Sequence, residues 1–206
     1  MPIIGRMQDL PGADTRIALD LALTVRHDGH GSVADDLADL AGLTAWAGNH
    51  PGIVPDGERF TADASTLAAV RDVRAAARSL FARAVRPGEP SPADAGRLLP
   101  VPEALGRLNE AAARTPTVPV LAWGDAAAPV VRSVPAQGAR TDLAAVLAQA
   151  VIGFLAGPDR QRLRACHAPR CVRYFLKEHP RQEWCKPSCG NRARVARHQE
   201  RHRRTG

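Results

Sequence analysis

The residues best suited to chemistry are four cysteines near the C-terminus. They are the only cysteines in the sequence. Cys166 and Cys171 are separated by four residues, and Cys185 and Cys189 by three. Two close pairs of thiolates can complete a tetrahedral zinc shell, with each pair held on a tight turn. No secretion signal is visible, so a reducing compartment is expected, which favours metal ligands over disulfides. The spacing therefore predicts a structural zinc site. Disulfide pairing or unrelated buried thiols are the alternative, and His167 and His179 are further donors that a four-cysteine shell does not need.

Positive charge gathers around these cysteines. The 206 residues hold 28 Lys plus Arg and 21 Asp plus Glu, a formal net charge of +7. Residues 160–206 carry 14 basic and three acidic residues, a net +11, which leaves 14 basic and 18 acidic residues and a net −4 for residues 1–159. A basic tail on a mildly acidic domain indicates contact with a polyanion.

The run of arginines after the second cysteine pair has helical spacing. Residues 191–204 read NRARVARHQERHRR. On a helix one stripe would contain Arg194, Arg197, Arg201 and Arg204, while Arg192 would lie on another side. A row of guanidinium groups can follow phosphates or enter a major groove. We therefore expect DNA contact, although phosphate contact alone would give this pattern and a solvated helix end is the plainer alternative.

The cysteine-bearing segment also supplies the elements that must hold its ligands. The first cysteine pair is expected to form a knuckle, from which residues 172–176 leave as a strand. Pro187 and Ser188 suit the start of a helix, which would place Cys189 in its first turn. These elements predict a small treble-clef-like zinc finger that ends in a basic helix.

The segment before the finger is expected to be mainly helical. Residues 15–26 alternate like a strand, but Asp14 as an N-cap and the alanines between the large residues favour a buried helix. Apolar repeats predict further helices over 33–48, from a cap at Asp63 or Ser65 to about residue 86, over 103–114, and from 142 to 157. Two β-type runs, 118–123 and 129–134, predict a short β-hairpin.

The Gly157-Pro158 pair and the change of charge after it predict a domain boundary. Residues 1–158 would form a helical domain and residues 159–206 the finger. The expected fold class is α+β, mainly α.

Neither catalysis nor a membrane span is expected. The sequence lacks a phosphate-cradling Gly-rich loop, a GxSxG run and an HExxH run, and a closed four-cysteine site leaves no open coordination position. The longest apolar stretch, 144–156, is too short to cross a bilayer, and the N-terminus does not read as a signal peptide. We expect a non-enzymatic, soluble, cytoplasmic protein.

Three other groups have simple structural explanations. The run His27-Asp28-Gly29-His30 could hold a metal, but two histidines in a Gly-containing loop are typical of a solvent-facing turn. The pair Asp35-Asp36 fits the start of a helix, where the dipole favours acidic residues. Trp46 and Trp123 could line a ligand pocket, yet large aromatic residues are more often part of the core.

The C-terminal segment RLRACHAPRCVRYFLKEHPRQEWCKPSCGNRARVARH resembles the CGNR zinc finger, named for the Cys-Gly-Asn-Arg run found here at 189–192. The likeness covers both cysteine pairs, Tyr174-Phe175, Trp184-Cys185 and the basic helix. In that family the finger follows an ABATE domain, described as a stress-induced transcription regulator. The segments IALDLALTVR and RLNEAAA and the helix before RLRAC are similar to that domain. Residues 22–24 read Ala-Leu-Thr where the family tends to have Val-Asn-Thr.

The resemblance implies zinc as the metal and transcription regulation through DNA binding. Arg194, Arg197 and Arg201 are the leading candidates for DNA contact, with Arg192 and Arg204 next. Gly190 would allow close packing beside the zinc or a phosphate, because it lacks a side chain. Asn191 could hydrogen-bond a cysteine sulfur, the finger backbone or a base, and a structural role is favoured because it lies beside a ligand.

An alternative function belongs to a different class. The finger could be a protein-interaction module with a structural zinc site, and the N-terminal domain could bind a small-molecule effector. RNA is a weaker partner, because the sequence shows no stacked aromatic residues on a sheet. The recognised DNA sequence, the effector, the sign of regulation and homodimer formation stay open.

Overall fold

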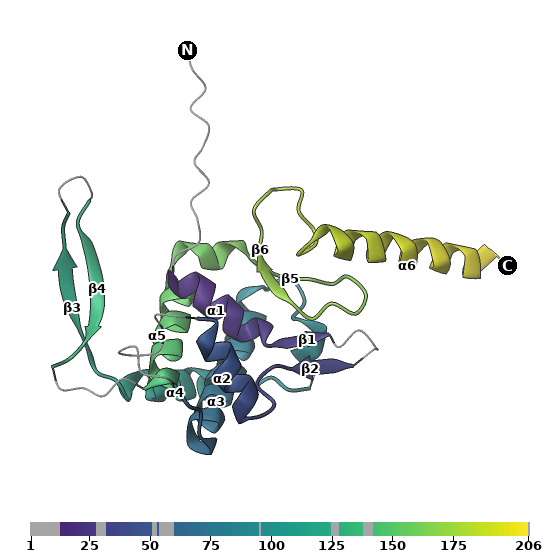
Figure 1. Cartoon of the computed structure of the whole chain (residues 1–206). Helices are drawn as coiled ribbons and strands as arrows, with labels where there is room; N and C mark the ends of the chain where they lie inside the picture. The colour runs from purple at the N-terminus through teal and green to yellow at the C-terminus, as the bar shows by residue number, and fades with distance from the viewer. Residues whose placement is uncertain are drawn as a thin grey trace, which may run out of the picture.

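The computed structural model describes residues 13–27, 32–50, 53, 60–94, 96–124, 128–137 and 142–205. α-Helices dominate this part of the chain, and its strands form three antiparallel pairs, which confirms the α+β, mainly α, class (Figure 1). The elements are, in order, α1 (Ala13–Leu23), β1 (Val25–His27), β2 (Val33–Asp35), α2 (Leu40–Gly48), α3 (Ala64–Ala84), η2 (Pro92–Asp94), α4 (Val101–Ala113), β3 (Thr117–Ala122), β4 (Val130–Pro135), α5 (Leu143–Ala156), η3 (Pro158–Arg162), β5 (Leu163–Ala165), β6 (Tyr174–Leu176) and α6 (Pro187–Thr205).

Aspartate side chains start three of the helices. Asp39, Asp63 and Asp142 have extended backbones, and each carboxylate accepts a hydrogen bond from the backbone N–H three residues further on. Such caps satisfy donors that the first helical turn leaves without partners. Asp63, rather than Ser65, is therefore the cap of the long helix α3, and the Ser65 hydroxyl donates to its carboxylate.

The core of the helical part lies between α1, α3, α4 and α5. α3 packs along α4 and α5, and α1 packs against α5. The largest fully buried side chains here include those of Leu21, Phe81, Leu108 and Phe154. Phe81 and Phe154 meet edge to face, with ring centroids 5.2 Å apart, an arrangement that aromatic quadrupoles favour.

The segment predicted as one helix over 33–48 divides into a strand and a shorter helix. Val33–Asp35 is β2, paired with β1, and α2 begins at Leu40. The pair Asp35-Asp36 therefore does not lie at a helix start, and that interpretation was wrong. The Asp35 carboxylate instead accepts two hydrogen bonds from Arg74 at 2.5 and 2.7 Å, and Asp36 pairs with Arg26 at 2.6 Å. These partners lie too far along the chain for a local pattern to show them.

α1 confirms the buried helix expected near the N-terminus, with two differences. Asp14 lies within the first turn of α1 and does not precede it, and the helix ends at Leu23, so that residues 25–27 are strand β1. The buried Thr24 hydroxyl donates to the Leu21 carbonyl at 2.7 Å where the helix gives way to the strand.

The hairpin of β5 and β6 belongs to the same core as the helices. Leu163, Tyr174 and Leu176 are buried in one cluster with α1, α3, α4 and α5. The ring of Tyr174 meets that of Phe81 edge to face at 5.5 Å. The helices and the first part of the finger therefore share buried surface across residue 158. The division into domains of residues 1–158 and 159–206 stays a prediction.

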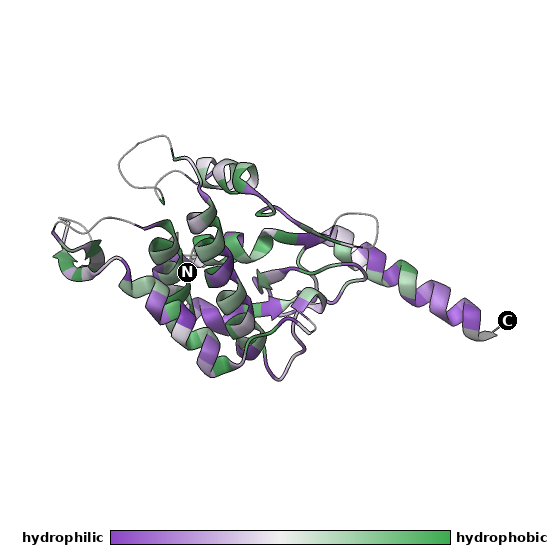
Figure 2. Ribbon diagram, turned by 90° about the horizontal axis from the view of Figure 1, so that it is seen from below, coloured by the Kyte–Doolittle hydropathy of each residue, from purple (hydrophilic) through white to green (hydrophobic). Residues whose placement is uncertain are grey.

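Two elements project from this body. The β3–β4 hairpin, which confirms the predicted pairing, extends from one side, and α6 extends from the other (Figure 1). Hydrophilic residues recur along the whole of α6 (Figure 2). Within the described residues no helix has the length and apolarity needed to span a membrane.

Candidate metal centre and basic helix

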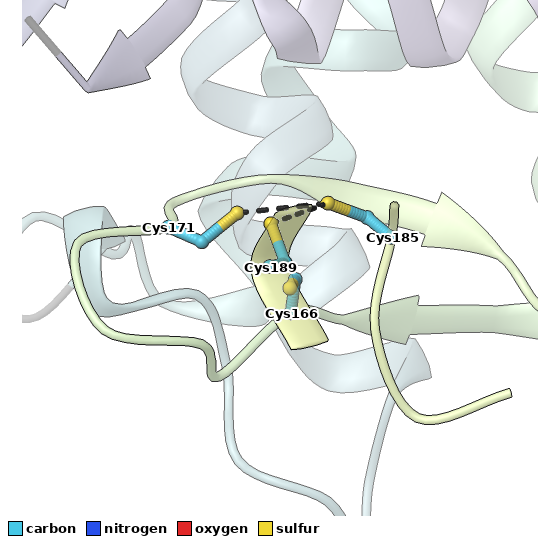
Figure 3. A group of neighbouring side chains, drawn as sticks. All are labelled: Cys166, Cys171, Cys185 and Cys189. Carbon is cyan, nitrogen blue, oxygen red and sulfur yellow. Dashed lines mark hydrogen bonds between the residues drawn. The ribbon is translucent and has the colours of Figure 1, made fainter. Parts of the chain in front are cut away.

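The four cysteine sulfurs converge at the junction of the β5–β6 hairpin and α6 (Figure 3). All four Sγ atoms lie within 4.8 Å of one another. Sγ of Cys185 is 3.7 Å from that of Cys171 and 3.5 Å from that of Cys189. A Zn–S bond of about 2.3 Å gives a tetrahedron with edges of roughly 3.8 Å, and a disulfide needs about 2.05 Å. The geometry and the donor set fit a tetrahedral zinc ion and do not fit disulfides.

A tight turn after β5 places the first pair. The backbone N–H of Cys171 donates to the Ala168 carbonyl at 2.9 Å, and that of Cys166 donates to the Arg173 carbonyl at 2.9 Å. Arg170 has a φ of 63°, in the left-handed region, just before the second cysteine of the pair. Both cysteines of the predicted knuckle are buried and point to the same centre.

The start of α6 places the second pair. Cys185 lies two residues before the helix, and Cys189 lies in its first turn, as predicted. The N–H of Cys189 donates to the Lys186 carbonyl at 3.0 Å. Gly190 is buried against the Trp184 indole: a Cβ at this position would lie 3.1 Å from Trp184 Cδ1. Any larger residue at position 190 would have to displace the Trp184 ring, which precedes Cys185.

The close approach of the four sulfurs opposes their full ionisation in the absence of a cation. Hydrogen bonds from the thiols of Cys171 and Cys185 lower the pKa of Cys166. The bond to Cys166 raises the pKa of Cys171 to about 11, and the neighbouring sulfurs also raise the pKa of Cys185. Four adjacent sulfurs thus cannot all ionise by themselves, whereas a bound zinc ion stabilises all four thiolates.

Arginine and asparagine side chains complete the Cys-Gly-Asn-Arg run. The guanidinium of Arg192 donates to Sγ of Cys189 at 3.1 Å. Such a bond offsets part of the negative charge of a tetrathiolate site. Asn191 Oδ1 accepts a hydrogen bond from Arg194. Asn191 therefore bonds to the next turn of its own helix, α6.

Most of the predicted DNA-contact residues are solvent-exposed. Arg192, Arg194, Arg197 and Arg201 are all exposed on α6. Arg197 also makes a weak bond from Nε to the Ala193 carbonyl at 3.4 Å. Arg204 lies within the helix, but its side chain is outside the described residues. Ala193 is the last residue of α6 described as buried, so the helix leaves the body after its second turn.

A buried polar network connects the cluster to the helices, and the sequence pattern does not reveal it. Arg78 of α3 donates to the carboxylate of Asp94 at 2.6 Å and to the carbonyls of Ala22 at 2.6 Å and Val172 at 3.4 Å. The Tyr174 hydroxyl donates to the same Asp94 at 2.6 Å. Val172 directly follows Cys171. The only sequence signal was an arginine on the apolar face of a predicted helix.

The other sequence candidates lie apart from this centre. His30 and Asp28 are outside the described residues, and His27 ends strand β1. Trp46 is buried and tilts against His50 in the core, as expected. Trp123 is 71% exposed, so its prediction as a core residue was wrong.

Comparisons with known proteins agree with this geometry. Residues 15–158 match the ABATE family model, described as "putative stress-induced transcription regulator", and residues 162–202 match the CGNR zinc finger. A search of curated proteins found no match. The cofactor is zinc, because the finger family and the four-cysteine cluster agree on it. The chain belongs to the ABATE family and carries a CGNR zinc finger after the ABATE domain.

Proposed function

We propose that this protein is a DNA-binding transcription regulator whose zinc centre fixes α6 against the body for contact with DNA. The observation that carries the proposal is the combination of anchor and charge on α6. The helix contains six arginines and one acid, Glu200, and only its first two turns include residues described as buried. A phosphate backbone is the partner that such a surface matches best.

The four cysteines are proposed as the zinc ligands, and the arginines divide between two roles. Arg194, Arg197 and Arg201 are proposed to contact phosphates or base edges, because they share the exposed stripe. Arg192 is proposed to act mainly through the zinc centre, since its guanidinium meets Sγ of Cys189. Arg204 continues the stripe by its spacing alone.

The N-terminal domain is proposed to sense a small anion or a partner. A cavity of about 180 Å³ between β1, β2 and α3 supports a small ligand. Its lining contains four arginines and two aspartates, namely Arg71, Arg74, Arg78, Arg97, Asp35 and Asp94. Arg78 lines this cavity and also donates a hydrogen bond to the Val172 carbonyl, next to Cys171. A ligand in the cavity would therefore contact a residue that is bonded to the finger. Small carboxylates and phosphates are the class to screen.

A salt titration of DNA binding tests the role of α6. The double substitution Arg197→Gln and Arg201→Gln should weaken binding to mixed duplex DNA. The slope of log K against log salt should fall by about 2, since each phosphate contact contributes about 0.9. Fluorescence anisotropy with labelled fragments of genomic DNA measures both quantities.

Arg114→Gln is the control, because Arg114 is exposed at the end of α4 and its substitution removes an arginine charge outside α6. It should leave the slope within about half a unit of wild type. Equal slopes for the control and the α6 variant would show that α6 does not contact DNA. Binding of single-stranded RNA in preference to duplex DNA would reject the proposed partner.

A further inference from the structure

The β3–β4 arm, residues 117–124 and 128–135, presents apolar side chains to solvent. Leu121 is 65% exposed, Val131 69% and Trp123 71%, and Val118 and Val120 are also exposed. β3 and β4 pack chiefly against one another, and the arm stands away from the helical body (Figure 1). Other exposed large apolar side chains, such as Leu105 on α4, are distributed over different elements.

The most exposed of these side chains share one face of the arm. Leu121 is directly opposite Val131 in the antiparallel register. Trp123 follows Leu121 by two residues, the spacing that keeps side chains on one face of an extended chain. An isolated two-stranded hairpin is marginally stable in water unless an apolar face is covered. The described helices of this chain do not supply an extensive cover.

The composition of the arm selects the kind of partner. Residues 117–124 contain no charged side chain, and Arg132 of β4 is paired with Val120 and not with Leu121, so the face formed by Leu121, Trp123 and Val131 includes no charged residue for DNA phosphates. Pro119 within β3 has no N–H, which disfavours extension of the sheet along that edge. The partner must therefore pack against the side-chain face.

We propose that the β3–β4 arm is a homodimer interface, in which the face formed by Leu121, Trp123 and Val131 packs against the same face of a second copy of this chain. The three exposed side chains of this face present on the order of 400 Å² of apolar surface per chain, within the range of the largest patch on a typical monomer. A twofold contact between two such faces buries on the order of 800 Å², the size range of weak, reversible associations. One patch serves both copies, because a twofold interface is self-complementary.

The dimer forms without DNA, so its test is independent of the proposed DNA binding. Sedimentation velocity of the full-length zinc-loaded protein, over about a hundredfold range of concentration, should show a monomer–dimer equilibrium. The double substitution Leu121→Ser and Val131→Ser should raise the dimer dissociation constant at least about tenfold. Leu105→Ser is the matched control, because Leu105 is 45% exposed on α4, and it should dimerise like wild type.

A second variant separates loss of the interface from loss of the hairpin. Trp123 lies just outside the paired residues of β3, so Trp123→Ser leaves the strand ladder intact and should also weaken the dimer. A wild-type protein that stays monomeric throughout the range would overturn the proposal. Dimerisation that both arm variants retain, or that Leu105→Ser abolishes equally, would overturn it as well.

Discussion

At the residue scale, each member of the Cys-Gly-Asn-Arg run has its own contact. Cys189 Sγ faces the other three sulfurs, and Arg192 donates to it. Gly190 contacts Trp184, and Asn191 accepts a bond from Arg194. The run therefore combines a proposed zinc ligand, a close packing point and a partner for an exposed arginine within one helical turn.

Two glycines within helices give a direct comparison of these contacts. Gly106 lies within α4, and a Cβ there would meet nothing within 4 Å. Gly106→Ala should raise the free energy of unfolding by about 1 kcal/mol, because alanine is the better helix former. Gly190→Ala should gain nothing or lose stability, because the new methyl group displaces the Trp184 ring next to Cys185. Urea denaturation of the zinc-loaded proteins measures both changes.

Zinc affinity is the second measurement on these variants. A competition titration should show weaker zinc binding for Gly190→Ala and unchanged binding for Gly106→Ala. If Gly190→Ala were as stable as Gly106→Ala and bound zinc as tightly, the Trp184 contact would not be the reason for glycine at this position.

At the element scale, the Asp35–Arg74 pair joins β2 to α3. Burial would raise the pKa of Asp35, but the hydrogen bond and charge of Arg74 outweigh it and hold that pKa below its usual value. A carboxyl whose pKa is lower in the folded state stabilises the fold above its unfolded pKa. That contribution disappears as the pH falls through the folded pKa.

Asp35→Asn should therefore lower the free energy of unfolding at neutral pH. It should also make that free energy fall less as the pH is lowered. At pH 7 the variant should lose about 1 kcal/mol, since Arg74 is largely buried while Asp35 is half-exposed. Between about pH 5 and pH 2 wild type should lose more stability than the variant, because the unfolded chain binds the extra proton. Asp36→Asn, which breaks a more exposed pair with Arg26, should change stability by less than about 0.5 kcal/mol. Thermal unfolding across this pH range compares the three proteins, and parallel curves for wild type and Asp35→Asn would contradict the role of the pair.

The same elements show how far the sequence could predict the fold. Helix starts at Asp63 and Asp142 follow local rules, and so does the β3–β4 hairpin. The strand at Val33–Asp35 does not, because its apolar spacing also fits a helix and its ion pair with Arg74 lies 39 residues away. Cysteine spacing located the metal centre because zinc geometry is local and strict. The bond from Arg78 to Val172 could not be foreseen, since it joins residues 94 positions apart.

At the scale of the whole molecule, the zinc finger and the helices share one core. Tyr174 packs on Phe81 and donates to the buried Asp94. The Val172 carbonyl, next to Cys171 of the four-sulfur cluster, accepts a hydrogen bond from the Ser91 hydroxyl at 2.8 Å. Loss of the metal should therefore affect more than the finger.

Removal of zinc should destabilise the entire chain. Chelation should lower the thermal midpoint of the whole helical signal by about 10 °C or more, because structural zinc contributes several kcal/mol to folding. Circular dichroism at a helical wavelength, together with zinc analysis, measures the change, and Cys185→Ser should reproduce it without chelator. Loss of the α6 signal alone, with an unchanged midpoint for the remainder, would instead support two independently stable domains.

The anchoring of α6 at one end makes the helix a lever. From the Trp184–Gly190 contact to its end at Thr205, the helix extends about 22 Å at 1.5 Å per residue, and Ala193 is its last buried residue among those described. A rotation of about 10° at this contact moves the far end by roughly 4 Å, more than the 3.4 Å rise of one base pair. Small angular changes at the Trp184–Gly190 contact are thus enlarged into shifts of a whole base step at the tip, so the stiffness of that contact sets how accurately the arginines can be positioned.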